Sequence, residues 1–264
     1  MLNHAASHTR PPAPVVPGGW GAPRFSTGIR DLDELTGGGI GSGELWLLTS
    51  APGQGRSTML TQLAAQMTCQ HEAATWLVSD RDPAYMVSGR LHSCLTRVPL
   101  NRIAKDKLDP CDTERLRAAE ARLEAAPLVL RAGRGARHHV LDDLRNCRST
   151  DRPAIALFDD PDWKDEWDLS EAHQLAENGI AVVVTLPRRR VLNGPVFGCD
   201  LNAVTEWADL VIEVRHDNLV AANVTPADKG SGYGAMVVLR NRRGPTTTLT
   251  VAFQGQYARF VDRP

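Results

Sequence analysis

The segment from Glu44 to Cys69 constrains the fold more than any other part of the sequence. An apolar run, Glu44–Ser50 (ELWLLTS), ends in a glycine-containing turn, and the stretch that follows, Ser57–Cys69, has apolar residues at helical spacing. A strand, a glycine-rich turn and a helix in this order are the context that a phosphate-binding loop requires. The pattern therefore favours an α/β fold built around a P-loop.

The turn itself supplies the candidate nucleotide-binding residues. Glycines let the backbone curl so that successive N–H groups point at phosphates, and the helix that follows adds its positive dipole end. Two positions depart from the usual pattern, because Ser50 replaces the first glycine and Arg56 replaces the lysine. The residues expected to bind ATP are Ser50, Gly53, Gln54, Gly55, Arg56, Ser57 and Thr58. The alternative is a glycine-rich turn that binds no ligand.

Further strands and helices alternate along the chain. Strands are predicted at Thr75–Ser79, Pro127–Leu130, Ala154–Phe158, Ile180–Leu186 and Leu210–Val214. Helices are predicted at Pro83–Thr96, Thr113–Ala126 with Thr113 as N-cap, His139–Cys147 and Leu169–Asn178, and consecutive strands at Gly234–Phe260. This order predicts an α/β fold with a mostly parallel sheet flanked by helices and finished by antiparallel strands.

Composition bounds the class of protein. The chain has 264 residues with a formal net charge of -1, so it carries no overall field that would attract nucleic acid. Its five cysteines are scattered without a CxxC pair, which argues against a zinc site and suits a reducing cytoplasm. No apolar run is long enough to cross a membrane. Residues 1–22 are expected to form a disordered Pro/Gly-rich tail or a docking arm, and residues 23–264 one nucleotide-binding domain.

Several motifs resemble the RecA-like motor domain of the DnaB-type replicative helicases. The stretch Phe25–Gly39, followed by Ile40–Leu45, resembles the segment that precedes the P-loop in this family. Thr205–Val211 is similar to its "IEQDADVV" segment, and Arg240–Thr246 is close to its "KxRNGPTG" segment. The resemblance runs from about Phe25 to Phe260, without a counterpart of the amino-terminal domain that meets primase.

The resemblance implies roles for residues at the ends of strands. Asp159, as the Walker B aspartate, would hold Mg²⁺ together with Ser57, the alternative being an ordinary solvated loop aspartate. The family's catalytic glutamate is replaced by Arg81, so Asp80 and Asp82 are the carboxylates that could serve instead. Thr185 and Leu186 stand where the family has its Ser-Gln sensor of the γ-phosphate, so the glutamine is lost.

The resemblance also implies contacts with other molecules. In ring helicases of this type, the residues that correspond to Arg240 and Arg242 contact the nucleotide of the neighbouring subunit. This correspondence implies a homo-oligomer such as a hexameric ring. The alternative is a solvated basic hairpin. The loop with Arg188, Arg189 and Arg190 would bind single-stranded DNA. A second basic cluster comprises Arg131, Arg134, Arg137, His138 and His139. For both clusters the alternative is a plain solvated surface.

Three functions follow from these features. The first is an ATP-driven DNA helicase or translocase that acts in DNA replication or repair. The second is a nucleotide-binding regulatory or scaffold subunit that does not hydrolyse ATP, because Arg56, Arg81 and Leu186 each alter a different part of phosphoryl-transfer catalysis. The third is an ATPase like RadA or KaiC, although the zinc motif usual in RadA and the duplicated domains usual in KaiC are not found in the sequence.

Overall fold

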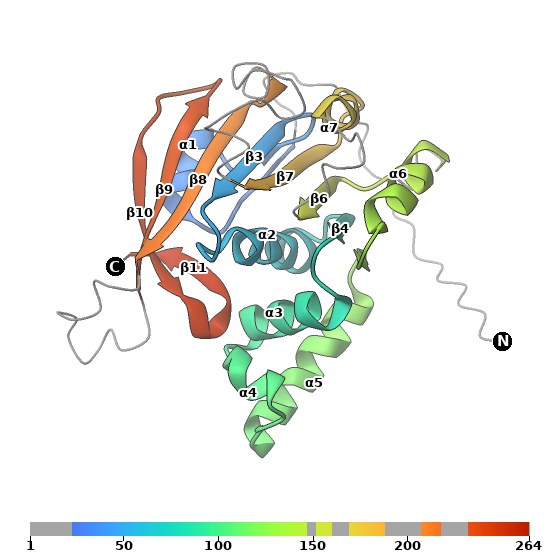
Figure 1. Ribbon diagram of the computed structural model, residues 1–264, viewed down its shortest axis with the longest axis vertical. Helices are drawn as coiled ribbons and strands as arrows, with labels where there is room; N and C mark the ends of the chain where they lie inside the picture. The colour runs from blue at the N-terminus through green and yellow to red at the C-terminus, as the bar shows by residue number, and fades with distance from the viewer. Residues whose placement is uncertain (1–22, 147–151, 160–168, 188–206, 218–231, 264) are drawn as a thin grey trace.

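A single large sheet organises the molecule. The computed structural model describes residues 23–146, 152–159, 169–187, 207–217 and 232–263. The large sheet has nine strands in the order β11-β10-β9-β8-β3-β7-β6-β4-β5, and β1 and β2 form a small antiparallel sheet (Figure 1). The strands are β1 Arg24–Phe25, β2 Ile40–Gly41, β3 Leu45–Ser50, β4 Thr75–Ser79, β5 Leu128–Ala132, β6 Ile155–Asp159, β7 Ala181–Pro187, β8 Leu210–Asp217, β9 Gly232–Asn241, β10 Thr248–Gln254 and β11 Arg259–Asp262.

The direction of the strands confirms the predicted fold class. Strands β8, β3, β7, β6, β4 and β5 run parallel, whereas β9, β10 and β11 each pair antiparallel with their neighbours. The central strands β3 and β7 are buried along nearly their whole length, which explains why their sequences show no alternation of polar and apolar residues. The carboxyl ends of the parallel strands therefore meet at one edge of the sheet, where ligands of open α/β sheets bind.

Helices cover both faces of the sheet (Figure 1). They are α1 Arg30–Thr36, α2 Arg56–Gln70, α3 Ala84–Thr96, α4 Leu100–Ala104, α5 Pro110–Ala125, α6 Ala136–Asn146 and α7 Leu169–Glu177. One apolar core lies between the sheet and α1, α2 and α3 and includes Trp46 and Leu63. A second core lies under α6 and α7 and contains Phe158 and Val140. Alternate residues of each central strand enter different cores, as the pleat requires.

The local predictions were less accurate at element ends. Thr113 is not the N-cap of α5, because this helix begins three residues earlier, at Pro110. Asp109 is the N-cap, and its carboxylate accepts a hydrogen bond of 2.8 Å from the backbone N–H of Asp112. The sequence pattern does not predict helices α1 and α4, because each is only one or two turns long. Such short segments cannot show the helical spacing of apolar residues.

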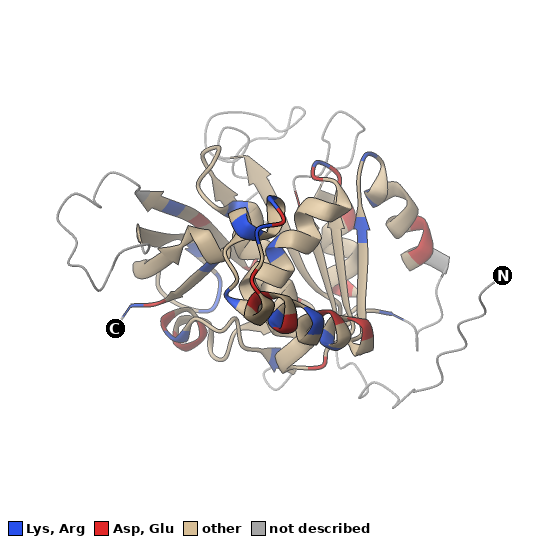
Figure 2. Ribbon diagram, turned by 90° about the horizontal axis from the view of Figure 1, so that it is seen from below, with Lys and Arg blue, Asp and Glu red and all other residues tan. Residues whose placement is uncertain are grey.

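Charged side chains of both signs are interspersed over the outer helices. Figure 2, viewed from the side of α4 and α5, shows acidic and basic stretches alternating along this part of the molecule. Such mixing fits the small net charge of -1. Within the described ranges, no helix combines the length and the apolar character needed to cross a lipid bilayer.

A buried carboxylate joins the amino-terminal segment to the sheet. Glu44 is 3% exposed and forms ion pairs with Arg24 at 2.7 Å and with Arg243 at 2.9 Å. It also accepts hydrogen bonds from the backbone N–H of Gly41 and from the indole N–H of Trp46, each at 3.0 Å. One side chain thus ties β2, β3 and the turn after β9 together, and its charge is compensated on every side.

We expect Glu44→Ala to lower the free energy of unfolding by about 3 kcal/mol, because it leaves two arginines without their buried counter-charge. Urea denaturation of the purified protein measures this change. The control is Glu34→Ala on α1, where the carboxylate is exposed and the expected change is within about 0.5 kcal/mol. Equal effects of the two substitutions would show that the Glu44 network contributes nothing special to stability.

Candidate nucleotide-binding site

The loop between β3 and α2 has the backbone geometry of a phosphate-binding loop. Gly53 and Gly55 have φ angles of 78° and 87°, in the left-handed region that favours glycine. Gly55 is the N-cap of α2, and no side chain caps this helix end. The N–H groups of the first turn of a 15-residue helix are thus left for a ligand, and they carry the positive end of the helix dipole.

The carboxy-terminal strands hold this loop in place. The backbone N–H of His216 in β8 donates to Oε1 of Gln54 at 2.7 Å, and its ring nitrogen Nε2 lies 2.7 Å from the carbonyl oxygen of Gly53. The His216 ring stacks on Phe253 with centroids 4.3 Å apart, and Phe253 packs on Phe260 at 4.7 Å. The side-chain oxygen of Gln54 is therefore engaged within the protein, and a contact between Gln54 and nucleotide stays a prediction.

Asp159 lies at the centre of the site. It is 4% exposed at the end of β6, and its Oδ1 accepts a hydrogen bond of 2.9 Å from the hydroxyl of Thr185 in β7. Ser57, in the first turn of α2, lies close enough to this carboxylate for its hydroxyl to lower the pKa of Asp159. The interpretation of Asp159 as an ordinary solvated loop residue is therefore wrong. The structure brings Asp159 and Ser57 together, as the resemblance implied.

The electrostatics of Asp159 reflect burial opposed by favourable contacts. Burial raises the pKa of its carboxyl above the ordinary value, while hydrogen bonds from Thr185 and Ser57 and the charges of Arg56 and Arg90 act in the opposite direction. Arg56 is 9% exposed, so its guanidinium lies inside the site. A carboxylate with two hydroxyls offers the oxygen ligands that Mg²⁺ prefers, directly or through water. This donor set fits a magnesium-nucleotide complex.

The two carboxylates that could replace the missing glutamate already have partners. Asp80 accepts a hydrogen bond of 2.9 Å from the backbone N–H of Arg137 at the start of α6, and the Arg137 side chain lies 4.0 Å away. Asp82 forms an ion pair of 2.5 Å with Arg90 of α3. Arg81, between them, is exposed. Both aspartates thus link β4 to neighbouring helices, which a free catalytic base would not do.

The two positions of the expected sensor lie on opposite faces of β7. Thr185 points to the side of α2 and bonds Asp159, whereas Leu186 is fully buried in the core under α6 and α7. Thr185 is therefore the polar group that β7 contributes to this site. Sequence reasoning did not find this pairing, although the alternation of side chains along a strand is the signal that could have shown it.

Arg240 and Arg242 lie at the opposite edge of the sheet from the P-loop. Arg240 pairs with Val211 at the beginning of β8, and the backbone N–H of Arg242 donates to Asp209 at 2.8 Å. The Arg242 side chain is 49% exposed and forms an ion pair of 3.2 Å with Asp209. The P-loop follows the end of β3, which runs parallel to β8, so these arginines do not meet the nucleotide site of their own chain.

The predicted nucleic-acid residues divide into two groups. Arg188, Arg189 and Arg190 lie outside the described residues. In the second basic cluster, Arg137 is 1% exposed and is engaged with Asp80. The prediction that Arg137 belongs to a solvated, phosphate-binding cluster is wrong, because its guanidinium is buried at the start of α6.

The fold and this site define a RecA-like P-loop domain. Residues 25–159, just over half of the chain, match the family of DnaB-like helicase C terminal domains. The chain belongs to this family, and the resemblance of its motifs to DnaB-type helicases is confirmed.

Curated relatives agree with this assignment. The replicative DNA helicase DnaB of Leifsonia xyli subsp. xyli (strain CTCB07) is 25% identical over 264 residues, which cover 89% of this chain and 55% of that protein. The chain therefore spans about half the length of this relative. The DNA repair protein RadA of Brucella abortus (strain 2308) is 49% identical over 47 residues, 18% of this chain and 10% of that protein.

Solved structures show the same fold. One solved ATPase domain superposes with a TM-score of 0.70 at 17% identity and covers 92% of each chain. A DnaB-like replicative helicase, described together with its interactions with primase, superposes with a TM-score of 0.73 at 15% identity, covering 94% of this chain and 65% of that one.

We expect Gly53→Ala to lower the free energy of unfolding by about 1 kcal/mol, because alanine is strained at a positive φ. Gly55→Ala should cost more, since its Cβ would also lie 2.8 Å from Cζ of Phe260. Urea denaturation of the two variants side by side measures the difference. A cost for Gly55→Ala no larger than that for Gly53→Ala would contradict the packing of Phe260 against the loop.

The raised pKa of Asp159 has a consequence for stability. The folded state holds this proton more tightly than the unfolded chain, whose carboxyl has its ordinary pKa of 3.8. The resulting stability is complete below that value and is lost as pH rises through the folded pKa. Asp159→Asn removes the ionisation and keeps an oxygen for Thr185. We therefore expect the variant to have a higher Tm than the unmodified protein at pH 7. At pH 4.5 the difference in Tm should be smaller.

Thermal melts across this pH range, without nucleotide, test the expectation. Asp82→Asn is the control, because it breaks the ion pair with Arg90 and should lower Tm at pH 7. If the Tm of Asp159→Asn at pH 7 is lower than the Tm of the unmodified protein, the expectation is contradicted. The neighbours of Asp159 would then stabilise its ionised form.

Proposed function

We propose that this protein binds ATP with Mg²⁺ at the loop Ser50–Thr58 and acts as a DnaB-type helicase or translocase ATPase in DNA replication or repair. The observation that supports this most strongly is the convergence of Ser57, Asp159 and Thr185 at the uncapped start of α2. Burying a carboxylate costs free energy unless the fold compensates it, so a ligand cation is a physical reason for its presence.

Within this site, each group has a defined role. The backbone N–H groups after Gly53 would bind the phosphates, and Arg56 would add a positive charge beside them. Ser57 and Asp159 would hold Mg²⁺, which when bound neutralises charge on the phosphates. Because an arginine is longer and forked, we expect it to bind phosphate more readily than it places charge in the transition state.

Assembly would complete the site. Arg240 and Arg242 lie far from the P-loop of their own chain, so a nucleotide contact by either one requires a second copy. We propose a homo-oligomer of the kind formed by ring helicases, with a hexamer as one arrangement. The triple-arginine segment 188–190 would then bind single-stranded DNA, and the protein would work in the cytoplasm.

A second candidate function is favoured by the partners of Asp80 and Asp82. Both carboxylates are held by arginines, and Arg81 stands at the glutamate position, so the site has no carboxylate ready to activate water among these three residues. A regulatory or scaffold subunit that binds nucleotide without hydrolysing it would need none. The two functions share the binding site and differ only in turnover.

We expect ATP with Mg²⁺ to bind the purified protein, and Arg56→Ala to weaken this binding about 10- to 100-fold, the worth of one charged hydrogen bond. Arg115→Ala is the matched control, since this arginine is exposed on α5. Calorimetric titration measures both affinities. Unchanged affinity in Arg56→Ala would show that the loop is not the ATP site.

Turnover is then measured with and without single-stranded DNA at low salt, where phosphate contacts are strongest. DNA-stimulated hydrolysis would support the motor. Binding without turnover would support the regulatory subunit, and a gain of hydrolysis in Arg56→Lys would identify the arginine as the cause. Absence of ATP binding would contradict both functions.

A further inference from the structure

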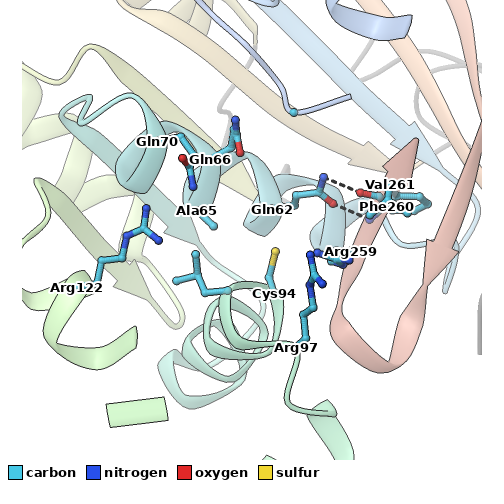
Figure 3. A pocket seen from close by; sticks show the side chains of 12 residues that line it. Gln62, Ala65, Gln66, Gln70, Cys94, Arg97, Arg122, Arg259, Phe260 and Val261 are labelled. Carbon is cyan, nitrogen blue, oxygen red and sulfur yellow. Dashed lines mark hydrogen bonds between the residues drawn. The ribbon is translucent and has the colours of Figure 1, made fainter. Parts of the chain in front are cut away.

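A polar cavity lies on the outer side of α2, away from the P-loop. Its volume is about 240 Å³, and its walls come from α2, the carboxy-terminal ends of α3 and α5, and β11 (Figure 3). Gln66 and Gln70 of α2 line it, three and four turns after the P-loop turn ends at Gly55. None of the lining residues belongs to the loop Ser50–Thr58, and neither Asp159 nor Thr185 is among them.

Three arginines converge on this cavity from different elements. Arg97 follows α3, Arg122 lies in the last turn of α5, and Arg259 begins β11. Figure 3 shows Arg97 and Arg259 at one end of the cavity and Arg122 at the other. No aspartate or glutamate of the described residues is among its lining side chains. The cavity therefore gathers three positive charges without a protein counter-charge.

Among the described lining residues, Cys94 is the only one that could become negatively charged, and its thiol is neutral. Burial raises the pKa of the Cys94 thiol to about 11, even though Arg259 acts to lower it. At neutral pH this thiol is protonated and cannot balance the arginines. Burial also lowers the pKa of Arg259, and the nearby charge of Arg97 lowers it further. The two guanidinium groups thus repel each other, and an anion between them would relieve that repulsion.

Most donors of these arginines remain available. Arg122 uses one nitrogen to bond the carbonyl oxygen of Cys69 at 2.6 Å, and Arg259 uses its Nε to bond Gln254 at 2.7 Å. Arg97 has no hydrogen-bond or ion-pair partner for its side chain among the described residues. Each guanidinium has five N–H donors in a planar fork, which matches the oxygens of phosphate.

The backbone at Arg97 adds to this picture. Arg97 is the C-cap of α3 and has a φ angle of 58°, a left-handed conformation in which glycine is the usual residue. A non-glycine residue is uncommon here, and the protein contact of Arg97 is the hydrogen bond of 3.0 Å from its backbone N–H to the carbonyl oxygen of Ser93. The observation fits a residue retained for what its side chain binds.

We propose that this cavity binds a small multivalent oxyanion, of the class of phosphate and pyrophosphate. Its volume of about 240 Å³ lies below the range of roughly 300–1,000 Å³ typical of pockets for drug-sized ligands. One or two phosphate groups therefore suit it better than a whole nucleotide. Two arginines side by side can bind such an ion in bidentate fashion, and Arg122 closes the far end.

The test uses the full chain and inorganic pyrophosphate, without Mg²⁺, in calorimetric titration and thermal melts. Because the P-loop could also bind pyrophosphate, four proteins are compared: unmodified, Arg56→Ala, Arg97→Gly and the double variant. We expect Arg97→Gly to lose at least tenfold in affinity at one site while binding at the P-loop is unchanged. Its Tm without ligand should equal or exceed that of the unmodified protein, because glycine accepts the left-handed φ.

The pyrophosphate affinity that survives in Arg56→Ala should disappear in the double variant. Arg117→Ala, which removes an exposed positive charge from α5, is the control and should retain full binding. If Arg97→Gly binds pyrophosphate as tightly as the unmodified protein, or if Arg117→Ala loses as much, the proposal is overturned. An error in the proposed ATP site would show separately, because Arg56→Ala would then bind pyrophosphate as the unmodified protein does. Inorganic phosphate, tested in the same series, shows whether one phosphate group is sufficient.

Discussion

The attachment of α2 to β11 is the contact on which the rest of the structure depends. The side-chain amide of Gln62 donates to the carbonyl oxygen of Phe260 at 2.8 Å and accepts from its backbone N–H at 2.6 Å. Both residues are buried, so these bonds are shielded from water and their loss would leave polar groups unsatisfied. Helix α2 carries the P-loop at its start and the arginine-lined cavity along its outer side. Fixing this helix therefore fixes both sites.

The same strands that hold α2 also shape the loop before it. Phe260 packs against Gly55, and Phe253 connects it to His216, which bonds Gly53 and Gln54. The loop conformation is thus supported by side chains far along the sequence. A preformed loop loses less entropy when it binds phosphates than a mobile one would. This support explains why a loop without the usual first glycine can keep the geometry of a phosphate site.

The altered family positions have different structural consequences. Arg56 is buried beside Asp159 and keeps a positive charge in the site. Arg81 is exposed, and the aspartates on either side of it are committed to other helices. Leu186 belongs to the core on the opposite face of the sheet, while Thr185 provides the polar contact. The groups placed to bind phosphate and a cation are therefore preserved more completely than the groups that would activate water.

The sequence by itself determined the sheet and the P-loop. Apolar runs without alternation predict buried parallel strands, and glycines after such a run predict a loop with positive φ, because these signals act over a few neighbouring residues. It did not predict the N-cap of α5, the partners of Asp80, or the buried position of Arg137. Only the tertiary structure decided that Arg97, Arg122 and Arg259 share one cavity and that Thr185 faces Asp159. These groups lie far apart along the chain, so their meeting depends on how strands and helices pack, which no local pattern records.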